Sequence, residues 1–155
     1  MAILNYTTTI DVHKTLGEIQ KCLVQHGAKQ LLYNYNDNGQ ITSLCFKINT
    51  LHGEVSIKLP ANIDAVYKVL QEQRKKGKIK INIDYDQATR VAWRIIKDWI
   101  LAQMAILETN MVKTEEVFLP YISNKMWAQS DYYIDKDFKT IETTKQYFED
   151  KAKEI

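Results

Sequence analysis

Residues 86–111 read DQATRVAWRIIKDWILAQMAILETNM and predict one long amphipathic helix. Its apolar side chains recur at helical spacing near one stripe, made of Val91, Ile95, Trp99, Ala102 and Ile106 and widened by Ala92, Ile96, Gln103 and Leu107. Asp86 is suited to cap the N-terminus, where its carboxylate also meets the positive end of the helix dipole. About 25 helical residues rise roughly 38 Å. The helix is therefore long enough to cross a small domain or to pair with a second subunit.

Three runs of alternating apolar and polar residues precede this helix, within residues 29–59. Turn residues separate them: Asp37-Asn38-Gly39 follows the first run and Leu51-His52-Gly53 follows the second. Pro60 ends the third run, because proline cannot donate to a strand ladder. This pattern predicts an antiparallel β-meander. A loosely alternating run at Ala2–Ile10 predicts a further strand, so we expect three to four strands.

Two shorter helices are predicted on either side of the meander. Thr15 and Glu18 have the spacing of a capping box at the start of the first helix, which ends at Gly27. Asn62 is suited to cap the second, which runs to about Gln73. Helices combined with an antiparallel meander make the predicted fold class α+β.

The domain organisation follows from these patterns. We expect residues 1–122 to form a single α+β domain and residues 123–155 to form an aromatic segment and a terminal helix, which serve as a docking or partner-binding extension. The 155 residues are 45% hydrophobic and 26% charged, which is typical of a globular protein. Because the sequence has no run of 18 apolar residues and no secretory signal, we expect a cytoplasmic protein without a membrane span.

Catalytic and metal-binding patterns are missing from the sequence. His13, His26 and His52 do not have the spacing of a zinc-type ligand set, and Cys22 and Cys45 are isolated from each other. No nucleophile elbow, Walker A loop or dinucleotide-binding glycine motif occurs. We therefore predict a non-enzymatic protein with no cofactor and no metal ion, and enzymatic function is the minority hypothesis.

The best predicted binding constellation lies on the long helix and consists of Arg90, Trp93, Arg94 and Lys97. Its three cations fall on one helical face, where guanidinium groups one turn apart can clamp a phosphate. The neighbouring indole can stack on a base. In the alternative interpretation the cations form structural ion pairs, Arg90 with Asp86 and Arg94 with Asp98, and the tryptophan fills a groove against the sheet.

Two further groups of residues are candidate contact surfaces. The first is the most basic stretch of the chain, residues 74–80, with the ligand- or partner-binding candidates Lys75, Lys76 and Lys78. The alternative for this stretch is a solvated turn. The second lies among polar residues near the C-terminus and consists of the aromatic candidates Trp127, Tyr132 and Tyr133.

Several strings of this sequence resemble one protein family. They are RVAWRIIKDWILAQMA at residues 90–105, VFLPY at residues 117–121, TLGEIQ at residues 15–20, HGA at residues 26–28 and LPAN at residues 59–62. Together they are similar to an uncharacterised family of small proteins of tailed phages and prophages of low-GC Gram-positive bacteria. The resemblance covers most of residues 1–122. It implies a phage protein that acts in the cytoplasm of an infected bacterial host cell, but it implies no activity.

In that setting we predict a phage-encoded non-enzymatic binding protein, and two roles stay open. The first is a counter-defence inhibitor that acts on a host immune effector or on its nucleotide signal, through an exposed aromatic or apolar patch. The second is an accessory protein of phage DNA replication or recombination that binds single-stranded DNA in a continuous basic groove. The net charge of +2 favours the inhibitor, because it is low for a non-specific DNA binder. In either role we expect a homo-oligomer, assembled through the long helix or the tail, and no membrane contact.

Overall fold

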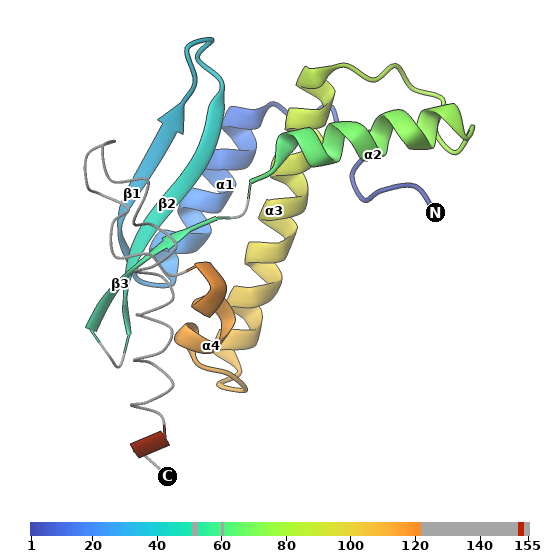
Figure 1. The fold of residues 1–155 in the computed structure, drawn as a ribbon. Helices are drawn as coiled ribbons and strands as arrows, with labels where there is room; N and C mark the ends of the chain where they lie inside the picture. The colour runs from blue at the N-terminus through green and yellow to red at the C-terminus, as the bar shows by residue number, and fades with distance from the viewer. Residues whose placement is uncertain (51–52, 60, 122–151, 154–155) are drawn as a thin grey trace. The chain divides into compact units, whose positions relative to one another are not determined.

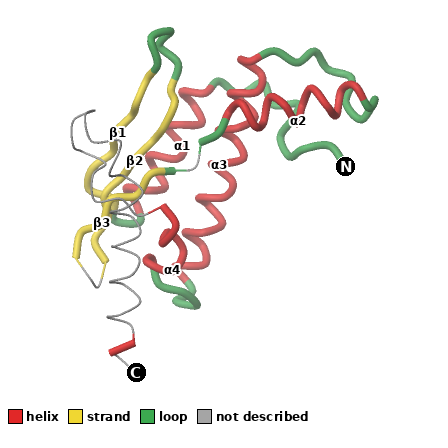
Figure 2. The backbone as a smooth tube through the Cα atoms, in the orientation of Figure 1, coloured by secondary structure: helices red, strands yellow, loops and turns green. Residues whose placement is uncertain are grey.

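The computed structural model describes residues 1–50, 53–59, 61–121 and 152–153 (Figure 1). It has the predicted α+β fold, with a three-stranded antiparallel sheet and a set of helices that includes one long helix (Figure 2). In chain order the elements are α1 (Val12–Gln25), β1 (Ala28–Tyr35), β2 (Ile41–Thr50), β3 (Gly53–Lys58), α2 (Ile63–Lys75), α3 (Tyr85–Glu108), α4 (Thr114–Phe118) and η1 (Leu119–Tyr121).

The chain divides into two compact units. The first, which we call the helical unit, is made of Met1–Gln25 and Pro60–Ala105. The second, the sheet unit, is made of His26–Leu59 and Ile106–Ile155. The predicted extension at residues 123–155 falls outside the described residues except for 152 and 153, so the predicted domain boundary stays a prediction.

The central strand of the sheet unit is β2, with β1 and β3 on its two sides (Figure 1). The antiparallel register places Leu31 of β1 and Ile57 of β3 opposite Phe46 of β2. The predicted turn between β1 and β2 is also present. Gly39 adopts a φ of 73°, and the side-chain oxygen of Asn36 accepts two backbone N–H groups of the turn. The predicted meander is therefore confirmed.

The core of the sheet unit joins β2 to α4. The fully buried ring of Phe46 meets the ring of Phe118 edge to face, with the ring centroids 5.6 Å apart. Such a pair contributes about 0.5–1.5 kcal/mol beyond the burial of its area. Leu44 and Cys45 are also buried, although neighbouring strand residues point to opposite faces. β2 is thus buried on both faces at its centre, where the apolar run Leu44-Cys45-Phe46 lies.

The helical unit is held together by an apolar cluster between α2 and α3. Its buried members are Ile63, Leu70, Ile79, Ala88, Val91 and Ala92. The predicted cap of α2 is confirmed, because Asn62 Oδ1 accepts a hydrogen bond from the N–H of Ala65 at 3.1 Å. The N-terminal segment packs against the same cluster through Ala2, Ile3 and Tyr6.

The strand predicted at Ala2–Ile10 is wrong, because this segment contains a turn and no strand. Side chains of the helices bind its backbone instead. Gln87 Nε2 donates to the carbonyl oxygens of Tyr6 and Thr8 at 2.9 and 3.0 Å, and Gln73 Oε1 accepts a hydrogen bond from the N–H of Ile3 at 2.9 Å. A threonine-rich run forms a strand only where a neighbouring strand pairs with its backbone.

The helix caps predicted at Thr15 and Asp86 are also wrong. α1 is capped by Asp11, whose Oδ1 accepts a hydrogen bond from the backbone N–H two residues later at 2.8 Å. α3 is capped by Asp84, whose Oδ1 accepts one from the N–H of Gln87 at 2.7 Å. In each case an earlier carboxylate reaches the first N–H groups of the helix, so the helix starts sooner than predicted.

The buried stripe of α3 overlaps the predicted one at Val91, Ala92 and Ile96 and is otherwise rotated from it. Its buried apolar residues are Ala88, Val91, Ala92, Trp93, Ile96, Ile100 and Met104. Three residues of the predicted stripe, Ile95, Trp99 and Ile106, are only partly buried, and Ala102 is exposed. Because α3 is apolar around most of its circumference, the spacing of its side chains does not by itself select the face that is buried.

Candidate functional site

Two of the cations predicted to bind a ligand on α3 are paired with carboxylates. Arg94 Nη1 donates to Glu18 Oε2 of α1 at 2.5 Å, and 13% of the Arg94 side chain is exposed. Lys97 Nζ lies 2.7 Å from Asp98 Oδ1, and 12% of the Lys97 side chain is exposed. Both charges are therefore neutralised within the protein and largely removed from solvent.

Asp98 has a second partner in the N-terminal segment. Asn5 Nδ2 donates to Asp98 Oδ2 at 2.7 Å. Although burial opposes the shift, the hydrogen bonds from Lys97 and Asn5 hold the pKa of Asp98 below its ordinary value. The carboxylate therefore stays charged at neutral pH and keeps the ammonium of Lys97 as its counter-charge.

Arg90 and Trp93 also have structural surroundings. Arg90 donates through Nε and Nη2 to Gln87 Oε1, at 3.1 and 2.6 Å. The relative exposure of Trp93 is 0%, and its indole Nε1 has no hydrogen-bond partner among the residues that the structure describes. An indole without exposed surface does not stack on a ligand in this conformation. The tryptophan belongs to the core, as the alternative interpretation expected, although Arg94 pairs with Glu18 rather than with Asp98.

The second predicted surface is exposed. We call its five cations, which lie at the end of the helix and in the following turn, the basic end of α2; they are Arg74, Lys75, Lys76, Lys78 and Lys80. Ile79, by contrast, is buried and belongs to the apolar cluster of the helical unit. The backbone that carries Lys78 and Lys80 is therefore anchored to the core by the residue between them.

Hydrogen bonds hold the backbone of the basic end in one conformation. The N–H groups of Lys76, Gly77 and Lys78 all donate to carbonyl oxygens in the last turns of α2, at 2.9 to 3.0 Å. Gly77 adopts a φ of 70°, which suits glycine and lets the chain leave the helix. Arg74 Nη1 donates to Asn82 Oδ1 at 2.6 Å, which closes the turn from the other side.

The helical unit carries the positive charge of the chain. Its two segments contain 11 Lys and Arg residues against seven Asp and Glu residues, which gives a charge of +4. The other segments contain 10 against 12, which gives −2. The whole-chain charge of +2 therefore conceals an uneven distribution, and an anionic partner is attracted to the helical unit.

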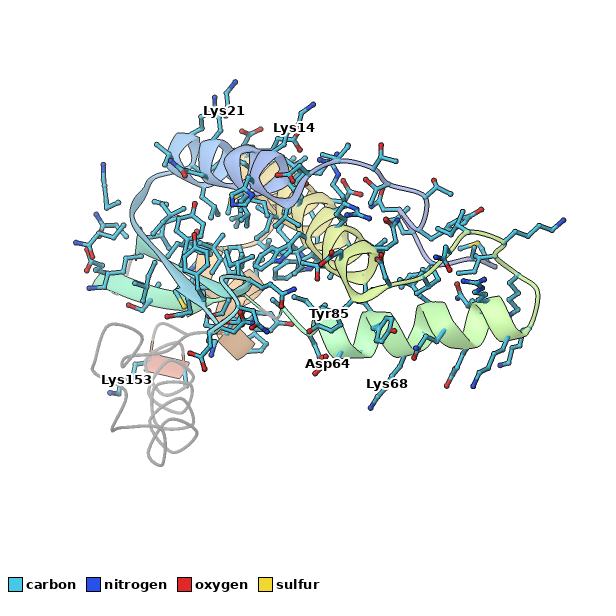
Figure 3. All side chains as sticks on the ribbon, turned by 90° about the horizontal axis from the view of Figure 1, so that it is seen from above. Lys14, Lys21, Asp64, Lys68, Tyr85 and Lys153 are labelled. Carbon is cyan, nitrogen blue, oxygen red and sulfur yellow. The ribbon has the colours of Figure 1, made fainter. Side chains whose placement is uncertain are left out.

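A tyrosine–aspartate pair lies at the N-terminal side of α2 (Figure 3). Tyr85 donates its hydroxyl proton to Asp64 Oδ1 at 3.1 Å, and the ring of Tyr67 meets the ring of Tyr85 at a centroid distance of 5.7 Å. Burial and the carboxylate raise the pKa of Tyr85. The phenol therefore keeps its proton, and the pair connects the start of α2 to the start of α3.

Trp127, Tyr132 and Tyr133 lie outside the described residues, so the predicted aromatic patch stays a prediction. Within residues 1–50, 53–59, 61–121 and 152–153, no three His, Cys, Asp or Glu side chains are grouped so that they could hold a metal ion. In the same part of the chain, no helix has both the length and the apolar character needed to cross a membrane.

Glu18 and Gln87 are site residues that the sequence patterns did not reveal. Glu18 was assigned to a helix cap, and it lies 76 residues from Arg94 along the chain. Gln87 is a buried polar residue on a helix with many apolar positions, and only its four hydrogen bonds explain it. α3 contains three cations and three carboxylates, so its composition alone does not indicate that Arg94 has a partner on another helix.

No family model, no curated protein and no solved structure matches this chain. The resemblance to small phage proteins therefore rests on the sequence strings quoted above. Among the described residues, the basic end of α2 is the predicted binding surface that is both exposed and ordered. It is the surface on which a functional proposal rests.

Proposed function

We propose that this chain is a phage-encoded binding protein, without catalysis of its own, that counters host defence by acting on an immune effector or on its nucleotide signal. Because the aromatic patch on which the sequence analysis based this role lies outside the described residues, the observation that carries the proposal is the basic end of α2, where five cations lie exposed within residues 74–80. A nucleotide signal and an acidic surface of an effector both carry the negative charge that this surface attracts.

The order of the turn supports a role in binding. A flexible run of lysines loses backbone freedom when it binds a partner, and that loss opposes association. At the basic end the backbone is already held by three N–H bonds, by the buried side chain of Ile79 and by the contact between Arg74 and Asn82. The entropy that remains to be lost on binding is mainly that of the lysine side chains.

A second candidate function is an accessory protein of phage DNA replication or recombination that binds single-stranded DNA. The charge of +4 on the helical unit favours it, because the low net charge of the whole chain no longer argues against a DNA contact. The predicted continuous groove is not formed by the described cations, since Arg94 and Lys97 are paired with carboxylates. DNA binding therefore depends on the basic end of α2.

The proposal is tested by phage plating on bacteria that carry a defence system and express this chain. We expect the wild-type chain to restore plating and the Lys78→Glu/Lys80→Glu variant to fail. The matched control is Lys14→Glu/Lys21→Glu, which changes the charge by the same amount at two exposed residues that extend outward from α1 (Figure 3). The control is expected to restore plating like the wild type.

Two results would decide between the candidates. If the wild-type chain restores plating against no defence system in a broad panel, the inhibitor role is wrong. If deletion of the gene lowers phage DNA accumulation in a defence-free host, and the basic-end variant does not rescue it, the accessory role is supported instead.

A further inference from the structure

We infer that the basic end of α2 docks on the phosphodiester backbone of a nucleic acid and contacts phosphates without reading bases. The inference rests on the second candidate function, the accessory protein that binds DNA, because it names the part of the nucleic acid that the same surface contacts. Three features of the described residues carry it. The backbone N–H groups of the basic end donate to the helix, residues 74–82 have no exposed large hydrophobic side chain, and they have no aromatic ring.

The backbone of the basic end does not form a binding site for a single phosphate. Proteins hold an isolated phosphate with free N–H groups, at a helix N-terminus or in a turn that points several of them at the anion. The basic end lies at the C-terminus of α2, and the N–H groups of Lys76, Gly77 and Lys78 donate to carbonyl oxygens of the helix. Recognition is left to the side chains, which act as separate point charges. A strand of regularly spaced phosphates contacts several of them at once, whereas a mononucleotide does not.

Residues 74–82 carry no exposed large hydrophobic side chain of their own that could anchor a protein partner. Protein interfaces depend on a few apolar or aromatic anchors that lose their contact with water. The exposed large hydrophobic side chains of the helical unit are Met1, Leu4, Val24, Val69 and Leu101, and none belongs to residues 74–82. A nucleic acid needs no such anchor, because the release of its condensed counterions supplies affinity to a cluster of lysines.

Residues 74–82 contain no aromatic ring that could read bases, and three rings elsewhere in the helical unit are engaged within the protein. Trp93 is buried, and the rings of Tyr67 and Tyr85 pack against each other, with the Tyr85 hydroxyl bound to Asp64. Base recognition requires stacking on a ring or hydrogen bonds to base edges. The basic end provides charge alone, so single strands and duplexes are both expected to bind, in proportion to their phosphate density.

The experiment is fluorescence anisotropy with labelled oligothymidine, oligoadenine and a duplex of equal length, as a function of salt concentration. With at most five phosphate contacts, the logarithm of the association constant should fall with the logarithm of salt with a slope of about −3.5 for a single strand and about −4.5 for a duplex. For the single strand this is a loss of about 100-fold between roughly 50 and 200 mM salt. The two single strands should bind equally.

Two double variants of equal charge locate the contact. Lys78→Glu/Lys80→Glu removes two contacts beyond the last turn of α2 and should reduce the slope by about 1.4, with at least roughly tenfold weaker binding at low salt. Lys14→Glu/Lys21→Glu should leave the slope unchanged. Thermal unfolding followed by circular dichroism shows that both variants are folded.

Four results would overturn the inference. The first is that a mononucleotide binds as tightly as the oligonucleotides do at the same salt concentration, and the second is that polyglutamate does so. The third is that the chain strongly prefers one base. The fourth is that the Lys78→Glu/Lys80→Glu variant leaves the salt slope unchanged. A chain that restores plating but binds no strand would leave the proposed function standing without this inference. A chain that binds strands but restores no plating would support this inference and contradict the inhibitor role.

Discussion

At the scale of single residues, the contact between Arg94 and Glu18 explains why a predicted ligand clamp is structural. The guanidinium is largely buried, and its Nη1 meets the carboxylate at 2.5 Å and the hydroxyl of Thr15 at 3.5 Å. A charge that is removed from water requires a partner of opposite charge, because its desolvation is otherwise uncompensated. The pair therefore connects α1 to α3, and the guanidinium is already bound to a carboxylate of the protein.

The Glu18→Ala variant should lower the free energy of unfolding by about 1–2 kcal/mol, because Arg94 stays desolvated without a counter-charge. Urea unfolding followed by circular dichroism measures the change. The control is Glu72→Ala, which removes an exposed carboxylate from α2 and should change the free energy of unfolding by no more than about 0.5 kcal/mol. A loss for Glu18→Ala no larger than that of the control would mean that this ion pair does not hold the helices together.

At the scale of the elements, one glycine lies within α1 and another follows its end, and the two differ in backbone conformation. A Cβ atom added to Gly17 or to Gly27 would meet nothing within 4 Å. Gly17 lies exposed within the helix, whereas Gly27 follows its end with a φ of 97°. Glycine weakens a helix interior through its backbone entropy, but it is favoured where the chain turns into the left-handed region.

Alanine at the two positions should therefore act in opposite directions. Gly17→Ala should raise the free energy of unfolding by about 0.5–1 kcal/mol, and Gly27→Ala should lower it by about 1–2 kcal/mol. Calorimetry should detect the difference as melting-temperature shifts of about 2–4 °C per kcal/mol in a chain of this size. Shifts of the same sign would mean that the backbone conformation does not decide the effect.

At the scale of the whole molecule, the predicted homo-oligomer has a specific candidate contact on α3. Leu101 is 44% exposed on this helix and is followed by the exposed residues Ala102 and Ala105. We propose this small apolar surface as the contact with a second copy of the chain. The mass of one chain is 18.1 kDa, so a dimer is distinguished readily by light scattering.

We expect the wild-type chain to elute as an oligomer and Leu101→Glu to elute with a mass close to 18.1 kDa. The control is Val24→Glu, which places the same charge at an exposed apolar residue of α1 and should leave the oligomer intact. An oligomer that survives both substitutions would point to the tail as the contact, the second route that the sequence predicts. A wild-type monomer at high protein concentration would contradict the prediction.

The features that the sequence alone determined are local ones. Alternating apolar residues and the turn at Gly39 predicted the meander, because strand pairing in a hairpin depends on neighbouring residues. The cap at Asn62 and the helix end at Gly27 are also predicted from local sequence. Asn62 accepts a hydrogen bond from a backbone N–H three residues later, and Gly27 adopts the left-handed conformation that ends a helix. The exposed basic stretch at residues 74–80 was also predicted, because a dense run of charge is rarely buried.

Only the tertiary structure decided which face of α3 is buried and which charges have partners. α3 is apolar on most sides, so contacts from distant segments, and not its periodicity, selected Trp93 for the core. The same holds for Arg94, whose partner Glu18 lies 76 residues away, and for the segment at Ala2–Ile10, whose backbone is bound by Gln87. A sequence displays spacing along one chain, whereas burial and ion pairing depend on which distant residues meet in space.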